Sequence, residues 1–280
     1  MARSIDDLRP LVGRCVLVPT MGALHDGHVA LVRRGVELAD RRGLPGGCVV
    51  SVFVNPTQFD DPSDLDRYPR TLEADQAACA TAGAAAVFAP GVDEVYPDGA
   101  ESALIDPPPP GVGKGLEDEH RPGHFAGVCT VLSRLFELIR PIAAVFGEKD
   151  WQQLVVTRAL VDRDGLGVEI IGEPTVREAD GLAMSSRNRF IPDGRREAAL
   201  SISRALRAAG AEQDPPSAER AMRDVLIGGG VDSIDYAVVR DARTLGPVTP
   251  DPLVERRALI TARVGPVRLL DNAAWIPTPA

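Results

Sequence analysis

The sequence predicts an α/β protein with a parallel sheet in its N-terminal part and a smaller α+β part behind it. Between residues 15 and 171, short continuous apolar runs alternate with segments of helical periodicity, a pattern typical of a parallel sheet covered on both faces. After Pro174, two helical patterns precede three strand-like runs with no helix between them. We therefore expect a Rossmann-like domain over residues 1–175 and a smaller α+β domain over residues 176–280.

Each apolar run in the first part predicts one strand. The five runs cover residues 15–18, 48–54, 86–89, 143–146 and 168–171. Stretches with apolar residues at helical spacing predict the covering helices over residues 28–40, 71–82, 123–139 and 151–161. Gly83 and Pro141 stop two of these helices. Residues 107–119 begin with consecutive prolines and contain several glycines, which favours an irregular surface excursion.

The second part has its own pattern. Helices are expected over residues 195–209 and 218–227, with a loop over residues 214–217 between them. Strands are expected over residues 235–239, 257–261 and 266–270. The change from alternating strands and helices to separated ones is the reason for placing a domain boundary near Pro174.

Composition and charge exclude several classes of protein. The formal net charge of −9 argues against a nucleic-acid-binding surface. The four cysteines lie far apart in the sequence and without metal-ligand spacing, so we expect buried free thiols and a reducing cytoplasm. The polar residues 1–10 indicate no signal peptide, and no apolar run approaches the roughly 18 residues that span a bilayer.

Three polar segments directly follow predicted strands. They cover residues 19–28, 55–59 and 147–150. Ligands of open parallel sheets bind outside the carboxyl ends of the strands, so these segments should share one site.

The first segment carries His25, Gly27 and His28 at the start of a predicted helix. A helix N-terminus favours phosphate, and two imidazoles there can stabilise charge on a transferring phosphate. Taken alone, the pair fits a structural role, on the surface or in the core, as well as it fits a catalytic role. A zinc site fits poorly, because no cysteine or carboxylate completes a ligand set.

The other polar segments also allow both a binding role and a purely structural one. Asn55 and Gln58 suit a small hydroxylated acid, although an Asn-Pro turn by itself favours a capping role. Lys149 can reach a phosphate, and Asp150 can cap a helix or contact ribose or Mg²⁺. Residues 184–188 offer two hydroxyls and a guanidinium that can close over a triphosphate, or form an ordinary polar linker.

Together these segments resemble the pantothenate synthetase (pantoate–β-alanine ligase) family. The matching stretches cover residues 19–28, 53–59, 121–125, 146–150 and 184–188, and residues 68–71 and 175–181 are also similar to family sequence. The His-x-Gly-His pattern alone marks a whole superfamily of nucleotidyltransferases and class I aminoacyl-tRNA synthetases. The full set, in family order over most of the chain, is specific.

The resemblance implies a two-step ligation that uses ATP with Mg²⁺. The carboxylate of (R)-pantoate attacks the α-phosphorus of ATP and gives pantoyl adenylate and pyrophosphate. The amine of β-alanine then attacks the acyl carbon and releases AMP and pantothenate. The resemblance also implies a homodimer in the cytoplasm, with no nucleic acid or membrane as partner.

Site residues carry over position by position. His28 matches the residue assigned as proton donor, His25 accompanies it, and Lys149 lies on the phosphates. Gln58 and Gln153 match contacts to pantoate, and Gln58 also matches a contact to the incoming β-alanine. ATP contacts are implied for Met21, Gly22, Ala23, Leu24, His25, Asp26, Gly27, His28, Gly147, Glu148, Lys149, Asp150, Val176, Met184, Ser185, Ser186 and Arg187.

Some positions depart from the family pattern. Relatives often have consecutive acidic residues near Asp75, a candidate region for metal contact, but here only Asp75 and Glu73 remain, so no protein ligand of Mg²⁺ is assigned. An adenylyltransferase that leaves AMP on its product, and a catalytically silent nucleotide-binding protein, are the competing hypotheses. A class I aminoacyl-tRNA synthetase is disfavoured by the short chain and acidic balance.

Overall fold

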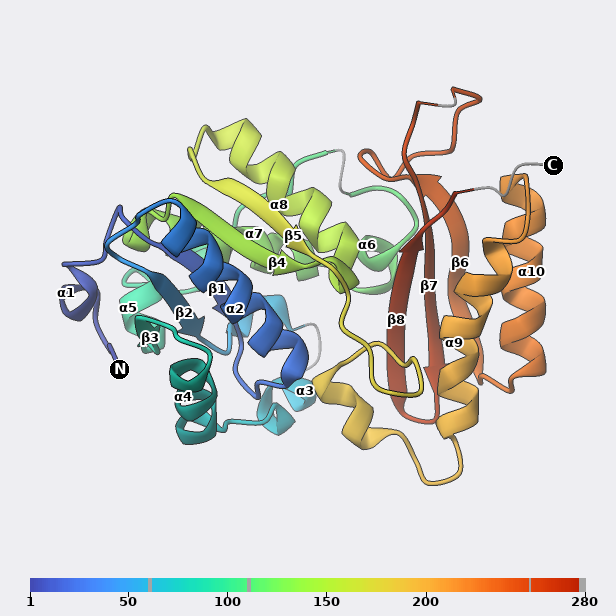
Figure 1. Ribbon diagram of the computed structural model, residues 1–280, viewed down its shortest axis with the longest axis horizontal. Helices are drawn as coiled ribbons and strands as arrows, with labels where there is room; N and C mark the ends of the chain where they lie inside the picture. The colour runs from blue at the N-terminus through green and yellow to red at the C-terminus, as the bar shows by residue number, and fades with distance from the viewer. Residues whose placement is uncertain (60–61, 110–111, 252, 277–280) are drawn as a thin grey trace.

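A five-stranded parallel sheet organises the N-terminal part of the chain (Figure 1). The computed structural model describes residues 1–59, 62–109, 112–251 and 253–276. The strand order is β3-β2-β1-β4-β5, and all neighbouring pairs are parallel. The strands are β1 (Val16–Thr20), β2 (Cys48–Val52), β3 (Ala86–Phe88), β4 (Ala143–Gly147) and β5 (Glu169–Glu173).

Helices cover both faces of this sheet, which is why its central strands are apolar at nearly every position. On one face, Val16, Val18 and Val50 pack in a cluster with residues of α2 (Asp26–Arg41) and α4 (Leu72–Thr81). On the other face, Leu17 and Val49 belong to a larger cluster with α7 (His124–Ile139) and α8 (Trp151–Asp164).

A three-stranded antiparallel sheet follows. It has the order β6-β7-β8, with strands β6 (Ser233–Asp241), β7 (Arg256–Val264) and β8 (Val267–Ala274). Alternation along β6 sends Ala237 and Val239 into a cluster with α9 (Arg196–Ala209) and α10 (Pro215–Gly228). Tyr236 and Val238 point the other way and join the cluster that contains α7 and α8, so this face of the small sheet shares a core with those helices.

These sheets confirm the predicted fold class, a Rossmann-like parallel sheet with a smaller α+β part. Every strand and helix expected from the apolar patterns is present, with ends displaced by a few residues. The division of the chain into domains at residues 175 and 176 stays a prediction.

Two local predictions are wrong. Residues 214–217 are not a loop: Asp214 caps α10 by accepting a hydrogen bond from the Ser217 amide at 2.9 Å, and Pro215 starts the helix. Proline fits there because its missing N–H would be unpaired in a first helical turn anyway. For residues 107–119 the predicted irregular backbone is present in the described part before α6 (Glu117–His120), but the surface location is wrong at its end, where Leu116 and Glu117 are buried. Residues 110 and 111 of that segment lie outside the described residues.

Short elements complete the chain and were not predicted. They are the helices α1 (Ile5–Leu8), α3 (Pro62–Arg67) and α5 (Val92–Val95), and the 3₁₀ turns η1 (Pro56–Gln58), η2 (Glu101–Ala103), η3 (Glu148–Asp150) and η4 (Ser186–Phe190). None is long enough to display a periodic apolar stripe.

The prediction of buried, free cysteine side chains is confirmed. All four cysteines are buried and free, and burial raises the pKa of Cys15 and Cys79 to about 11 and of Cys48 and Cys129 to about 12. Across the described ranges, no helix combines the length and apolar character needed to span a membrane.

Candidate active site

A cleft of about 290 Å³ opens at the carboxyl ends of the parallel strands. β1 and β4 are neighbours in the sheet, but the chain leaves them toward opposite edges, which makes this the topological switch point where open α/β sheets bind ligands. Met21 follows β1 and Gly147 ends β4, and both line the cleft. The small sheet supplies the opposite wall through residues 269–272 of β8.

Most of the residues singled out from the sequence meet in this one cleft. Those that line it are Met21, His25, Gly27, His28, Gln58, Gly147, Lys149, Asp150, Gln153, Val176, Met184, Ser185, Ser186 and Arg187. Five others do not line it, namely Gly22, Ala23, Leu24, Asp26 and Glu148.

The turn between β1 and α2 explains why three of those five face away. Gly22 and Ala23 have φ angles of 84° and 53°, so the chain makes a left-handed turn that glycine favours. The buried carboxylate of Asp75 holds it, accepting from the amide of Ala23 at 3.0 Å and of Leu24 at 2.8 Å. Thr71 donates its hydroxyl to the same carboxylate. Both oxygens of the Asp75 carboxylate are therefore used to hold the loop between β1 and α2.

The same geometry fixes the protonated nitrogen of each histidine. The His25 amide donates to Nδ1 of His28 at 3.3 Å, and the Gly27 amide donates to Nδ1 of His25 at 3.1 Å. In a neutral ring the proton is then on Nε2, which leaves Nε2–H as the group that each ring can offer a ligand. The ring centroids are 4.1 Å apart.

Both histidines are neutral at physiological pH. Burial, then the neighbouring His25, lowers the pKa of His28 to about 3. Burial and the charge of Lys149 also lower the pKa of His25. The pair can therefore offer a ligand hydrogen-bond donors with no formal charge, and the positive charge of Lys149 lies nearby.

Gln58 reaches the cleft from η1. Asn55 caps this turn by accepting from the Thr57 amide at 3.4 Å. It also accepts from the Tyr96 hydroxyl at 2.8 Å and donates to Oε1 of Gln58 at 3.2 Å. Asn55 also lines the cleft, but it is 1% exposed and its side chain is bonded within the protein, so the capping alternative describes it. Its half-buried partner Gln58 is the side chain of the two that can reach a ligand. The Gln58 amide approaches Sδ of Met21 at 3.1 Å.

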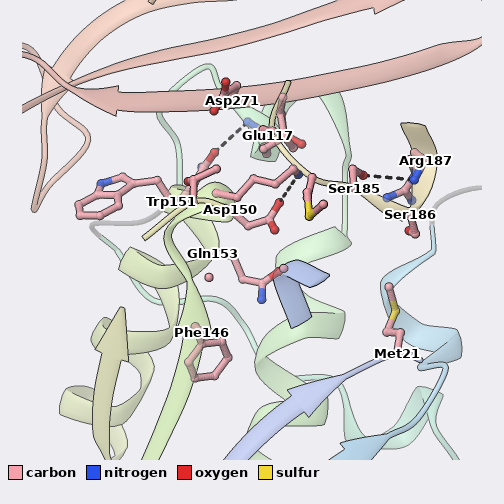
Figure 2. A pocket seen from close by; sticks show the side chains of 18 of the residues that line it. Met21, Glu117, Phe146, Asp150, Trp151, Gln153, Ser185, Ser186, Arg187 and Asp271 are labelled. Atoms are coloured by element: carbon pink, nitrogen blue, oxygen red, sulfur yellow. Dashed lines mark hydrogen bonds and ion pairs between the residues drawn. The ribbon is translucent and has the colours of Figure 1, made fainter. Parts of the chain in front are cut away.

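The end of β4 supplies the charged groups. Nζ of Lys149 lies 3.5 Å from Oδ1 of Asp150, and Figure 2 shows Asp150 and Gln153 on the same side of the cleft. Glu148 points to the small sheet instead, where Oε2 pairs with Arg257 at 3.0 Å. This pairing accounts for the absence of Glu148 from the cleft wall.

Residues 174–188 form the remaining wall. The Met184 amide donates to the carbonyl of Val176 at 2.9 Å, which closes this segment on itself. The Ser185 hydroxyl then accepts from the Arg187 amide at 3.2 Å and starts η4. In Figure 2, Ser185, Ser186 and Arg187 lie together across the cleft from Trp151.

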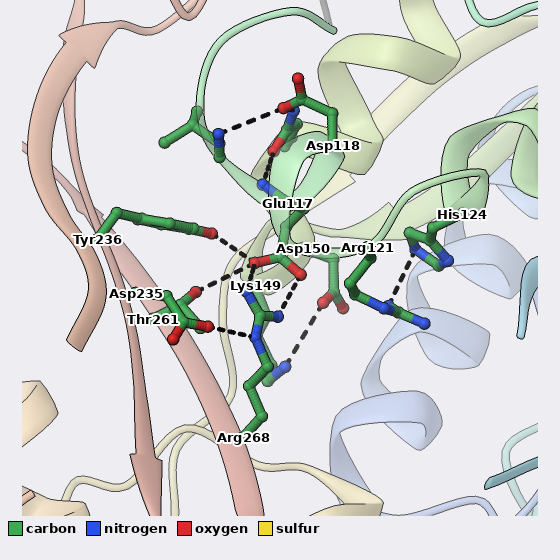
Figure 3. A network of polar contacts seen from close by, with 12 residues as sticks. Glu117, Asp118, Arg121, His124, Lys149, Asp150, Asp235, Tyr236, Thr261 and Arg268 are labelled. Atoms are coloured by element: carbon green, nitrogen blue, oxygen red, sulfur yellow. Dashed lines mark hydrogen bonds and ion pairs between the residues drawn. The ribbon is translucent and has the colours of Figure 1, made fainter. Parts of the chain in front are cut away.

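Sequence reasoning gave no role to Arg121 and His124, which also line the cleft. Nη1 of Arg121 lies 3.1 Å from Nε2 of His124 (Figure 3). Nδ1 of His124 lies 2.9 Å from the carbonyl of Gln58. They stand in the motif 121–125, so the family resemblance contained the signal although spacing did not.

The carboxylates that line the cleft decide whether Mg²⁺ fits. Glu117 and Asp271 line the cleft but are paired with Arg268 and Arg177. Asp150 is about half exposed, and its ion-pair partner among the described residues is Lys149. Mg²⁺ in nucleotide sites needs one or two carboxylates besides phosphate oxygens and water, so Asp150 fits as its protein ligand. Within the described residues, no group of three metal-ligating side chains exists.

Comparisons with known proteins agree with this geometry. The family model described as pantoate-beta-alanine ligase matches residues 1–274. A pantothenate synthetase of Nocardioides sp. is 52% identical over 264 residues, which cover 91% of this chain and 77% of the relative.

Solved structures give the same result. The pantothenate synthetase of Thermus thermophilus is 41% identical, with a TM-score of 0.86 and coverage of 98% of this chain and 99% of that one. The pantoate-beta-alanine ligase of Francisella tularensis, complexed with beta-gamma ATP and beta-alanine, is 30% identical, with a TM-score of 0.77 over 98% of this chain and 96% of that one. The chain therefore belongs to the pantoate–β-alanine ligase family.

Proposed function

We propose that this chain joins pantoate to β-alanine at the expense of ATP and forms pantothenate, AMP and pyrophosphate. The observation that carries the proposal is the meeting of His25, His28, Lys149, Gln58 and Gln153 in one cleft of a chain that belongs to this family. The Francisella tularensis relative was solved in complex with beta-gamma ATP and beta-alanine, which supports the same substrates here.

The first step activates the pantoate carboxylate. A carboxylate oxygen bonds to the α-phosphorus of ATP while the bond from that phosphorus to the bridging oxygen breaks, and pyrophosphate leaves with the electron pair. Negative charge grows on phosphate oxygens, where Nε2–H donors of His25 and His28 and the ammonium of Lys149 would stabilise it. Gln58 and Gln153 would orient pantoate through uncharged hydrogen bonds.

The second step makes the amide. The neutral amine of β-alanine attacks the acyl carbon of pantoyl adenylate, the bond from that carbon to the phosphate oxygen breaks, and AMP leaves. The nitrogen loses one proton as the amide forms. Gln58, held by Asn55, would position the amine beside the activated carbonyl.

Mg²⁺, a closing motion and assembly complete the proposal. Mg²⁺ would neutralise phosphate charge, and Asp150 would hold it. Residues 176–280 would close over ATP through Val176 and the segment 184–187, with Ser185, Ser186 and Arg187 contacting phosphate. We also propose a homodimer that works in the cytoplasm, as the family resemblance implies.

An assay of AMP release tests the reaction. With ATP, pantoate and β-alanine present, AMP and pantothenate should form in equal amounts. Omission of pantoate or of β-alanine should abolish AMP release. An adenylyltransferase would release pyrophosphate from ATP and pantoate, and would still release no AMP after β-alanine is added. Absence of any pantoate-dependent turnover would indicate a silent nucleotide-binding protein.

The variant His28→Ala tests the site. We expect it to fold normally and to lose about a hundredfold in pantoate-dependent ATP–pyrophosphate exchange, the scale for removal of one donor to developing charge. Exchange at the wild-type rate would refute the role given to His28. Asp40→Ala, an exposed change on the same helix, is the matched control.

A further inference from the structure

Two neighbouring side chains of β8, Asp271 and Asn272, contact both segments that carry the proposed phosphate-binding groups. Each is only 3% exposed. We propose that they are positioning residues: Asn272 fixes the loop of Lys149, and Asp271 fixes the segment that ends in Arg187. This inference rests on the phosphate roles proposed above for Lys149 and Arg187.

Asn272 holds the backbone of the lysine itself. Its Nδ2 donates to the carbonyl of Glu148 at 3.0 Å and to the carbonyl of Lys149 at 2.7 Å. Its Oδ1 accepts from Nε of Arg257, so every donor and acceptor of the amide has a partner. The point from which the Lys149 side chain starts is therefore set by a residue of the small sheet.

Arg257 strengthens this attachment. Its guanidinium lies 3.4 Å from the ring centroid of Trp151 and donates to Oε2 of Glu148 at 3.0 Å. Glu148 and Trp151 flank Lys149 and Asp150 along the chain, so the loop is held on both sides. A cation stacked on an aromatic face and paired with a carboxylate is a stronger anchor than an exposed ion pair.

Asp271 holds the other segment. Both its oxygens pair with Arg177, at 2.6 and 3.0 Å, and Arg177 also donates to the carbonyl of Gly181 at 3.1 Å. Val176, the preceding residue, accepts from Met184, next to Ser185. The backbone N–H of Asn272 donates to Oδ1 of Asp271 at 2.8 Å. One dipeptide thus sets the spacing between two phosphate-binding segments.

A purely structural role would make the same contacts, so the test must measure coupling to the phosphate groups. Pantoate-dependent ATP–pyrophosphate exchange is measured for the single variants Asn272→Ala, Asp271→Asn, Lys149→Ala and Arg187→Ala. It is also measured for the four double variants that combine one change in β8 with one change at Lys149 or Arg187. Trp275→Phe is the matched control, because it removes another buried side-chain bond to a carbonyl, that of Ala209, just after β8 and away from the cleft.

We expect Asn272→Ala to lower the exchange rate about tenfold, the effect of a displaced catalytic group, with little change in the KM for pantoate. In the Lys149→Ala background the further loss should be less than twofold, because the group that Asn272 positions is gone. Asp271→Asn should show the same dependence on Arg187. In the double variants that combine Asn272 with Arg187, or Asp271 with Lys149, the losses in exchange rate of the two single variants should multiply.

Hydrogen exchange gives a second readout. Residues 147–153 should exchange faster in Asn272→Ala and stay unchanged in Trp275→Phe. If the Asn272 and Lys149 effects multiply fully, the inference is wrong while the proposed function stands. If Lys149→Ala and Arg187→Ala catalyse ATP–pyrophosphate exchange like wild type, the proposed phosphate roles fail first, and the inference falls with them.

Discussion

At His25 and His28 the backbone decides which ring nitrogen carries the proton. Each Nδ1 accepts a main-chain N–H, so the donor that remains is Nε2–H, and burial keeps both rings neutral. The spacing of the two histidines predicted that they lie together at a helix N-terminus. It could not predict their pKa values, because those depend on Lys149 and on burial by distant segments.

The lowered pKa of His28 makes the stability of the protein depend on pH. The folded ring stays neutral down to about pH 3, whereas the unfolded ring binds a proton below about 6.5. The unfolded state therefore binds more protons in this window. As the pH decreases through it, the free energy of unfolding decreases by about 1 kcal/mol per pH unit.

Urea unfolding of wild type and His28→Gln between pH 7.5 and 5 measures this contribution. The wild type should lose more stability than the variant over that range. Equal slopes would contradict the neutral, buried ring. His120→Gln is the control, since His120 is exposed on α6.

Asp75 offers a second prediction for a single residue. Asp75→Asn keeps one acceptor but replaces the other with an amide that cannot accept from Ala23 or Leu24. We expect about 1–3 kcal/mol less free energy of unfolding, because a buried N–H loses its partner, and a higher KM for ATP because the loop before His25 shifts. Glu73→Gln, exposed on the same helix, should change neither quantity.

Among the secondary-structure elements, those with a periodic apolar pattern could be predicted and those without one could not. The strand from Cys48 and the helix to Ile139 each display their buried faces in the sequence. η1 and α6 are too short for periodicity, and contacts with α7, α8 and the small sheet fix their positions. The surface location of residues 107–119 was predicted wrongly at its end because proline-rich composition does not reveal the one carboxylate, Glu117, that other elements surround.

Packing between α7 and η1 gives a prediction at this scale. A Cβ at Gly127 would lie 2.2 Å from the carbonyl oxygen of Thr57 and 2.6 Å from Cα of Gln58, and backbone cannot yield as a side chain can. Gly127→Ala should push η1 away from α7 and destabilise the protein by about 1–3 kcal/mol. Because Gln58 moves with η1, the KM for pantoate should rise several-fold more than the KM for ATP.

Gly228→Ala is the matched control for this helix substitution. Gly228 lies at the end of α10 and has nothing within 4 Å of the added Cβ. It should be neutral or slightly stabilising, as glycine-to-alanine changes in helices are. Gly127→Ala with unaltered pantoate kinetics would show that α7 does not set the position of Gln58.

For the whole molecule, a buried ion cluster joins α6 to the small sheet (Figure 3). Glu117 of α6 accepts from both terminal nitrogens of Arg268 at 2.6 Å and from the Tyr236 hydroxyl at 2.7 Å. Arg268 also pairs with Asp235 at 2.6 Å. These partners lie 119 and 151 residues from Glu117 in the chain, so no local pattern could connect them. Gln152 adds α8 to the cluster through the Glu117 amide.

Glu117→Gln tests how much this cluster contributes to holding α6 on the small sheet. Burial by itself would raise the pKa of Glu117, but hydrogen bonds and charge from Arg268, aided by Tyr236, lower it to about 2. Removing the charge leaves Arg268 buried with Asp235 alone, so we expect about 3 kcal/mol less free energy of unfolding at pH 7. The exposed Glu119→Gln on the same helix is the control.

The pH dependence separates loss of charge from loss of packing. In the unfolded chain Glu117 titrates near its ordinary value of 4.5, so its stabilising effect is complete above that pH and declines as pH falls toward about 2. The difference in unfolding free energy between wild type and Glu117→Gln should therefore be constant from pH 7 to about 5 and shrink by pH 3.5. A difference that stays the same at pH 3.5 would mean that shape, not the charge of Glu117, joins α6 to the small sheet.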